Sequence, residues 1–127
     1  MKSIYEISIG DNNKCIFLSA ERVIIRSTDD NKVKLTTTEA KMLKLLCSHV
    51  GKNVKRAYIE DEVWRGRGVI PTAASLNQLV CTLRQKIKHV AEMNIIVTVP
   101  RVGFILSDIV NVYPKIDRSN HLTHHKN

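Results

Sequence analysis

Amide, hydroxyl and basic side chains recur at helical spacing between residues 74 and 88. When successive residues are placed about 100° apart and the leucines point inward, the opposite, outward line is small or uncharged. That line and the position beside it hold Ala74, Gln78, Cys81, Gln85 and Thr82. Glutamine and asparagine amides can form paired hydrogen bonds with base edges in a major groove, with adenine in particular. The outward line therefore has side chains of the kind that read a base sequence.

Basic side chains border the outward line on both sides, where they could neutralise the phosphates on the two walls of a groove. The two borders comprise Asn77, Arg84 and Lys88 on one side and Ser75 and Lys86 on the other. No acidic residue occurs between positions 63 and 91. A helix that faces only solvent would more often carry Lys and Glu on its outermost line. The pattern favours a helix that lies in a nucleic-acid groove.

The helix that must position these side chains is predicted over about residues 72–88. Pro71 and Thr72 supply its start signal. A single apolar stripe follows at spacings of four, three and four residues, and it consists of Leu76, Val80, Leu83 and Ile87. We expect this stripe to lie in the core and the amide-bearing line to be exposed.

Two further helices are expected before this one. Threonine N-cap candidates and a first-turn glutamate precede apolar residues at helical spacing, which predicts a helix over about 37–50. A second, short helix is expected because Ile59, Val63 and Trp64 share one face. A basic, glycine-rich loop, 65–68, ends it. The three helices together form the centre of the predicted domain.

Strands are expected on both sides of the helices. β-Rich runs separated by polar turns predict an antiparallel meander within residues 1–35. Two more β-rich runs, 95–99 and 104–106, predict a hairpin whose turn ends at Gly103, where we expect a positive φ. Arg101 stands at the tip of this hairpin, where a long cation could enter an adjacent minor groove. An exposed turn residue without a partner is an equally good interpretation of Arg101.

The composition favours one small domain with an anionic partner. The chain has 127 residues, 43% of them apolar, which suffices for one core and excludes collagen-like and wholly disordered chains. Lys and Arg number 20 against 12 Asp and Glu, so the formal net charge is +8. Residues 63–107 hold six of the cations and one of the anions. The sequence contains neither an apolar run long enough to span a membrane nor a secretory signal.

Metal, disulfide and enzyme chemistry are not indicated. The three cysteines are far apart and outside any CxxC spacing, so we expect no metal site and no cofactor. Three histidines between positions 121 and 125 have a spacing that could bind a metal on a helix, but they lie in a polar tail. The acidic residues 60–62 spread around a helical turn instead of converging, so we expect no enzymatic activity.

Four segments, in this order, resemble the winged helix-turn-helix effector domain of the OmpR/PhoB type. They are LTTTEAKMLKLL (35–46), VKRAYIEDEVW (54–64), SLNQLVCTLRQKI (75–87) and TVPRVGFIL (98–106). The resemblance implies an α+β fold with an N-terminal antiparallel β-meander (1–35), followed by three helices and a C-terminal β-hairpin wing (36–107). Residues 1–107 would form the DNA-binding domain, and 108–127 would be a polar linker or tail.

The resemblance also assigns roles to particular positions. The candidate DNA-binding residues are Trp64, Ser75, Asn77, Gln78, Cys81, Thr82, Arg84, Gln85, Lys88 and Arg101. Those at 77, 78, 81 and 82 would approach bases, whereas Arg84 and Lys88 would contact phosphates. Trp64 would pack at the helix junction with its indole N–H near a phosphate, and Arg101 would act in the wing. The loop formed by Arg65, Gly66 and Arg67 would contact RNA polymerase.

Within the family, the resemblance leans toward ToxR- and CadC-like regulators. The wing reads Thr-Val-Pro-Arg, and no receiver domain precedes the helices, because only about 35 residues lie upstream. We therefore expect no activation by phosphorylation of this chain. In ToxR-like proteins the input arrives through a membrane-spanning helix after a linker, although a stand-alone regulator fits equally well. The expected location is the bacterial cytoplasm, with any inner-membrane tether outside this sequence.

Two departures from the family pattern bear on affinity. Lys55 stands where the family often has a small N-cap hydroxyl, and the recognition face lacks the several arginines of the phosphorylated relatives. Affinity for promoter DNA would then be modest, so we expect dimeric or tandem binding. The competing interpretation is a winged helix that contacts RNA polymerase or another regulator through residues 65–70 without binding DNA. A test of DNA binding distinguishes this interpretation from that of a DNA-binding regulator.

Overall fold

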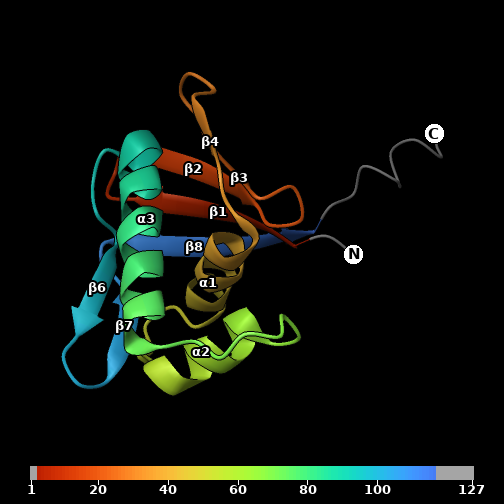
Figure 1. Ribbon diagram of the computed structural model, residues 1–127. Helices are drawn as coiled ribbons and strands as arrows, with labels where there is room; N and C mark the ends of the chain where they lie inside the picture. The colour runs from red at the N-terminus through yellow and green to blue at the C-terminus, as the bar shows by residue number, and fades with distance from the viewer. Residues whose placement is uncertain (1–2, 117–127) are drawn as a thin grey trace.

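The computed structural model describes residues 3–116, which form two antiparallel sheets and three helices. The elements are β1 (Ser3–Ile9), β2 (Asn13–Leu18), β3 (Val23–Arg26), β4 (Lys32–Lys34), α1 (Thr37–Ser48), β5 (Val54–Lys55), α2 (Arg56–Trp64), α3 (Ala73–Ala91), β6 (Ile96–Val99), β7 (Gly103–Leu106) and β8 (Val110–Ile116). Figure 1 shows α3 standing across the larger sheet, with β6 and β7 beside its N-terminal half. The predicted α+β class, meander, three helices and hairpin are confirmed.

The larger sheet has the strand order β4-β3-β2-β1-β8 and forms one side of the core. Alternate side chains on β1 and β2 point toward the helices, and Tyr5, Ile7 and Phe17 are buried there. This alternation is the reason the meander was readable from the sequence, because side chains on a strand alternate between its two faces. The helices cover this face of the sheet with Met42, Leu43, Ile59, Leu76 and Leu83, all buried.

The prediction of a polar linker or tail over 108–127 is wrong for residues 110–116. These residues form β8, which pairs with β1 over its whole length, from Ile9 opposite Val110 to Ser3 opposite Ile116. The strand pattern is weak in the sequence because it is interrupted by Asn111, Pro114 and Lys115. Proline is tolerated here because β8 is an edge strand. The folded unit therefore extends to 116 rather than 107. The remainder of the predicted tail, with the three histidines at 121–125, lies outside the described residues.

Both long helices begin with a capping box. Thr36 accepts from the backbone N–H of Glu39, and Thr72 does the same for Ser75, while the side chains at 39 and 75 bond back to the N-cap backbone. α2 follows Lys55 without a side-chain cap, as the missing hydroxyl predicts. α3 runs to Ala91, three residues beyond the expected 88, because its buried stripe continues through further apolar residues.

The wing is a three-stranded sheet in the order β5-β7-β6, so the predicted hairpin gains one short strand. Val54 pairs with Phe104 and Lys55 with Gly103. The expected positive φ at Gly103 is wrong, because the residue with positive φ in this turn is Arg101, at 65°. Glycine is required at 103 for a different reason: a Cβ there would lie 1.9 Å from the backbone oxygen of Val54. The close approach of β5 makes this position intolerant of any side chain.

Candidate nucleic-acid interface

α3 exposes one polar face, and we call it the α3 surface. It comprises Asn77, Gln78, Cys81, Gln85 and Lys88, all exposed. The stripe on the opposite side, from Leu76 to Ile87, is at most 3% exposed at each of its four positions. The helical periodicity thus separated core from surface correctly. The α3 surface carries amide, thiol and ammonium groups and no carboxylate.

Ser75 and Thr82, two of the candidate DNA-binding residues, are turned toward the protein. Both are half-buried. The Ser75 hydroxyl belongs to the capping box with Thr72, at 3.0 Å between the two oxygens. The Thr82 hydroxyl donates to the backbone oxygen of Leu79 at 3.2 Å. These hydroxyls hold the local structure of α3 rather than extend its polar face.

Arg84 connects α3 to the wing by hydrogen bonds. Its Nε and Nη2 donate to the backbone oxygen of Ile96 at 3.1 and 2.8 Å, and Nη2 also donates to Thr98 Oγ1 at 2.8 Å. The guanidinium carbon lies 5.9 Å from the centre of the Phe104 ring. The structure therefore gives Arg84 an internal role, and the phosphate contact expected from the sequence stays a prediction. Arg84 sets the position of β6 relative to the recognition helix.

Arg56 is a functional candidate that the sequence analysis missed. Its guanidinium carbon lies 5.7 Å from the centre of the Phe104 ring. Its Nη2 donates to Oδ1 of Asn77 at 3.0 Å and to the backbone oxygen of Ala73 at 3.5 Å. Only its place in the segment 54–64 could have drawn attention to it, because the contact with Asn77 spans 21 residues. Arg56 links the start of α2 to the N-terminal turns of α3.

A buried ion pair holds α1 against α3. Glu39 is 3% exposed, and Nζ of Lys86 lies 2.7 Å from its Oε1. Burial by itself raises the pKa of Glu39, but hydrogen bonds from Lys86, the Thr36 backbone and Thr82 outweigh it, so its pKa lies below the ordinary value. Lys86 is therefore committed to the fold. It contributes less to an external positive border than the sequence suggests.

A shallow groove of about 460 Å³ runs beside α3 toward the start of α1. Its lining includes Thr36, Thr38, Trp64, Gln78 and Gln85. Trp64 is half-buried against the core at the end of α2, where the helix-junction role was expected. Arg101 is exposed in the turn between β6 and β7. The groove and the wing tip thus extend the polar area on either side of the α3 surface.

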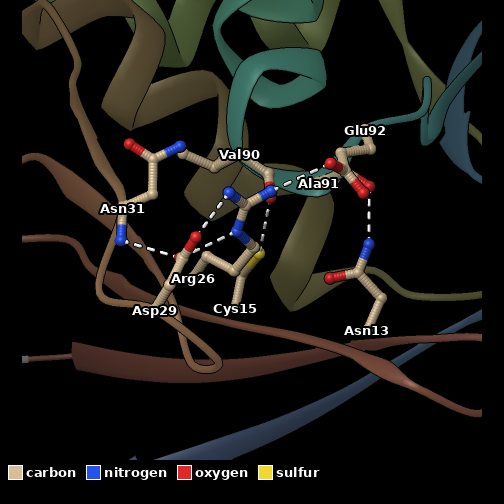
Figure 2. Close-up of polar contacts among 8 residues, drawn as sticks. All are labelled: Asn13, Cys15, Arg26, Asp29, Asn31, Val90, Ala91 and Glu92. Atoms are coloured by element: carbon tan, nitrogen blue, oxygen red, sulfur yellow. Dashed lines mark hydrogen bonds and ion pairs between the residues drawn. The ribbon is translucent and has the colours of Figure 1, made fainter.

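The C-terminal end of α3 is anchored to the larger sheet (Figure 2). Nδ2 of Asn13 donates to the backbone oxygen of Ala91 at 2.6 Å. Arg26 Nη1 lies 3.2 Å from the Glu92 carboxylate, and its Nε and Nη2 donate to Asp29 at 2.9 and 2.8 Å. The hydrogen bond from Arg26 lowers the pKa of Asp29 to about 2. Carbonyls at a helix end need such donors, and here the sheet provides them.

The loop between α2 and α3 exposes both charge and apolar surface. Arg65 pairs with Glu62 and with Asp61, the latter at 2.9 Å. Gly66 and Gly68 have φ of 74° and 72°, a backbone conformation that other residues rarely adopt. Ile70 is 90% exposed. Of the predicted polymerase contacts, Arg65 is thus already engaged, whereas Arg67 is exposed, as is the nearby Ile70.

Residues 3–116 offer no candidate for a metal site or for a membrane-spanning helix. This part of the chain contains no group of three or more His, Cys, Asp or Glu side chains that could hold a metal ion. Within the same residues, none of the helices is both long and apolar enough to cross a bilayer. Cys15 and Cys47 are buried, and Cys81 is exposed on α3.

The helices, the paired wing and the exposed α3 face define a winged helix-turn-helix domain. The family described as transcriptional regulatory protein, C terminal, matches residues 30–106, and the chain belongs to this family. The predicted OmpR/PhoB-type assignment is therefore confirmed. A comparison with curated proteins finds no match.

Several solved structures are similar to this chain. The DNA-binding domain of E. coli CadC has 24% identity and a TM-score of 0.68, covering 85% of this chain and 96% of that one. The C-terminal domain of the nisin resistance regulator NsrR has 29% identity and a TM-score of 0.56, with 68% and 84% covered. The Klebsiella pneumoniae RstA DNA-binding domain, in complex with the RstA box, has 24% identity and a TM-score of 0.59, with 80% and 96% covered.

Proposed function

We propose that this chain is a sequence-specific DNA-binding transcriptional regulator that places α3 in a major groove and the wing at the adjacent minor groove. The observation that carries the proposal is the α3 surface, an exposed face with amides and without acids, in a member of a transcriptional regulator family. The similarity in fold to the RstA domain, which was solved in complex with the RstA box, supports DNA binding. A protein-contact module that does not bind DNA would have no use for such a face.

The candidate DNA-binding side chains fall into three groups, which would contact bases, contact the DNA backbone or minor groove, or support the helix. Gln78, Cys81 and Gln85 stand on the exposed line of α3, where amides can bond base edges. Lys88 at the border of α3 and Arg101 in the wing turn are exposed cations that would neutralise phosphates or enter the minor groove. Ser75, Thr82, Arg84 and Trp64 would support this face from behind.

The test is a titration of labelled AT-rich and GC-rich duplexes, followed by fluorescence anisotropy at several salt concentrations. The wild type should bind with a steep salt dependence, because released counterions drive the association. Replacing both Lys88 and Arg101 with alanine should weaken binding to every duplex and lower the salt slope by about two, one for each lost phosphate contact.

The matched control removes the same charge from outside the α3 surface and the wing. Lys32 and Lys34 are exposed on the edge strand β4, so Lys32→Ala with Lys34→Ala should leave the salt slope near the wild-type value. Absence of binding even at low salt would refute the proposal. An equal loss in both double variants would show that binding follows net charge and not the α3 surface.

We also propose that the α2–α3 loop contacts RNA polymerase. The exposed Arg67 and Ile70 support this proposal, because exposed apolar side chains, Val69 and Ile70, close to a cation suit a protein partner. Ile70→Ser with Arg67→Ala should reduce transcription from a regulated promoter while the affinity for DNA stays unchanged. Loss of both activities together, or of neither, would contradict it.

The proposal also includes dimeric or tandem binding on DNA and an input signal received as in ToxR-like regulators. One α3 surface carries a single unengaged cation, Lys88, so two copies on adjacent half-sites would supply affinity that one copy lacks. Electrophoretic mobility shifts on single and paired sites should give steeper binding on paired sites. The proposed location is the bacterial cytoplasm, with a membrane tether as the ToxR-like alternative to a stand-alone regulator.

A further inference from the structure

The amide of Asn77 is held in one orientation by Arg56. Arg56 Nη2 donates to Asn77 Oδ1 at 3.0 Å. A guanidinium has five N–H donors and no acceptor, so the amide can face it only with its oxygen. The Nδ2 group, with its two N–H donors, is consequently left for whatever binds the exposed border of α3. The orientation follows from the chemistry of the partner and not from the space around the amide.

Arg56 is itself fixed on its other side. Phe104 is 3% exposed in β7, and the guanidinium carbon of Arg56 lies 5.7 Å from the centre of its ring. Arg84 lies near the same ring, at 5.9 Å, and bonds to β6. The two arginines therefore join the wing, the start of α2 and the recognition helix. An arginine restrained in this way can restrain the amide that it binds.

We propose, on the basis of the proposed function, that Arg56 is a positioning residue that makes Asn77 a hydrogen-bond donor toward DNA. The paired amide contact with adenine needs the amide oxygen to accept from N6, and cytosine also offers a donor there, at N4. Oδ1 is engaged by Arg56, so Nδ2 is the group that Asn77 offers to DNA, and it can donate to guanine O6 or N7, thymine O4 or adenine N7. Cytosine presents no acceptor in the major groove, so Asn77 selects against cytosine at one operator position and lacks the preference for adenine typical of an unrestrained asparagine.

The experiment is selection of binding sites from a randomised duplex library, followed by sequencing, with wild type and three variants. Arg56→Met keeps a long side chain against Phe104 but has no donor, and Arg56→Lys keeps a donor. Lys55→Met removes the same charge from the exposed neighbouring residue. The wild type should favour guanine, thymine or adenine over cytosine at one position by at least about fivefold.

Arg56→Met should lose this discrimination against cytosine and gain a preference for adenine at that one position, while Arg56→Lys and Lys55→Met retain the wild-type pattern. Asn77→Asp keeps an oxygen toward Arg56 and has no N–H, so it should also lose the base preference at that position. If circular dichroism shows that Arg56→Met does not fold, Asn77→Asp provides the test in its place. An unchanged motif in the folded variants, or a loss spread evenly over all positions, would overturn the inference. Failure of the wild type to enrich any duplex would instead refute the proposed function and the inference with it.

Discussion

Removing the Lys86 ammonium should destabilise the fold through the buried carboxylate of Glu39. Lys86→Met keeps the apolar stem of the side chain and leaves Glu39, 3% exposed, without its charged partner. Stranding one member of a fully buried pair costs about 3–5 kcal/mol. Because the Lys86 side chain is 32% exposed, solvent screens the pair, and we expect a loss of about 2 kcal/mol in the free energy of unfolding.

The size of this loss should depend on pH. In the wild type the pKa of Glu39 lies below its ordinary value: burial raises it, but the hydrogen bonds from Lys86 and Thr36 prevail. The pair therefore stabilises the fold above the unfolded-state pKa, and this stabilisation is lost as the pH falls through the folded-state pKa. In Lys86→Met burial is less opposed, the pKa of Glu39 rises, and protonation relieves the stranded charge. The difference between the two proteins should be largest near pH 7 and shrink toward about pH 4.

Thermal and urea unfolding at several pH values measure this difference. A loss of about 2 kcal/mol corresponds to a fall in Tm of about 8 °C for a domain of this size. Lys88→Met, on the exposed face of the same helix, is the matched control and should change stability by less than about 0.5 kcal/mol. Adding Glu39→Gln to Lys86→Met should recover part of the loss, because glutamine can still complete the capping box. Equal stability of the two lysine variants, or a difference that does not vary with pH, would refute the reasoning.

Three further predictions follow from single positions. Gly103→Ala should lower the free energy of unfolding by about 2 kcal/mol or more, because its Cβ would meet the Val54 oxygen at 1.9 Å; an unchanged urea midpoint would contradict this. Gln78→Ala should broaden base preference in the site selection with the salt slope unchanged, and an intact preference would show that Gln78 does not read a base. Alkylation of the native protein at about pH 8 should modify Cys81 alone, as read by mass spectrometry, since burial raises the pKa of Cys15 to about 11 and that of Cys47 further; early modification of either buried thiol would contradict the core packing.

The recognition helix could be predicted from the sequence because its signals are local. A helix repeats every 3.6 residues, so four apolar residues from Leu76 to Ile87 were enough to define which side is buried and which is exposed. Thr36 and Thr72 marked the helix starts because an N-cap hydroxyl bonds a backbone N–H only three residues away. The meander was equally readable, because alternation along a strand needs no knowledge of its partner.

What only the tertiary structure decided are the roles that depend on contacts between distant segments. Val110–Ile116 carries a weak strand pattern and becomes β8 because β1 offers it a free edge. Arg84 looked like a phosphate contact by its place on the helix, yet the nearby Ile96 oxygen and Phe104 ring engage it internally. The amide of Asn77 was known to be exposed, but its direction is set by Arg56 across 21 residues of chain. Periodicity fixes the side of a helix on which a group lies, whereas the partners that use its hydrogen-bonding capacity are brought there by the fold.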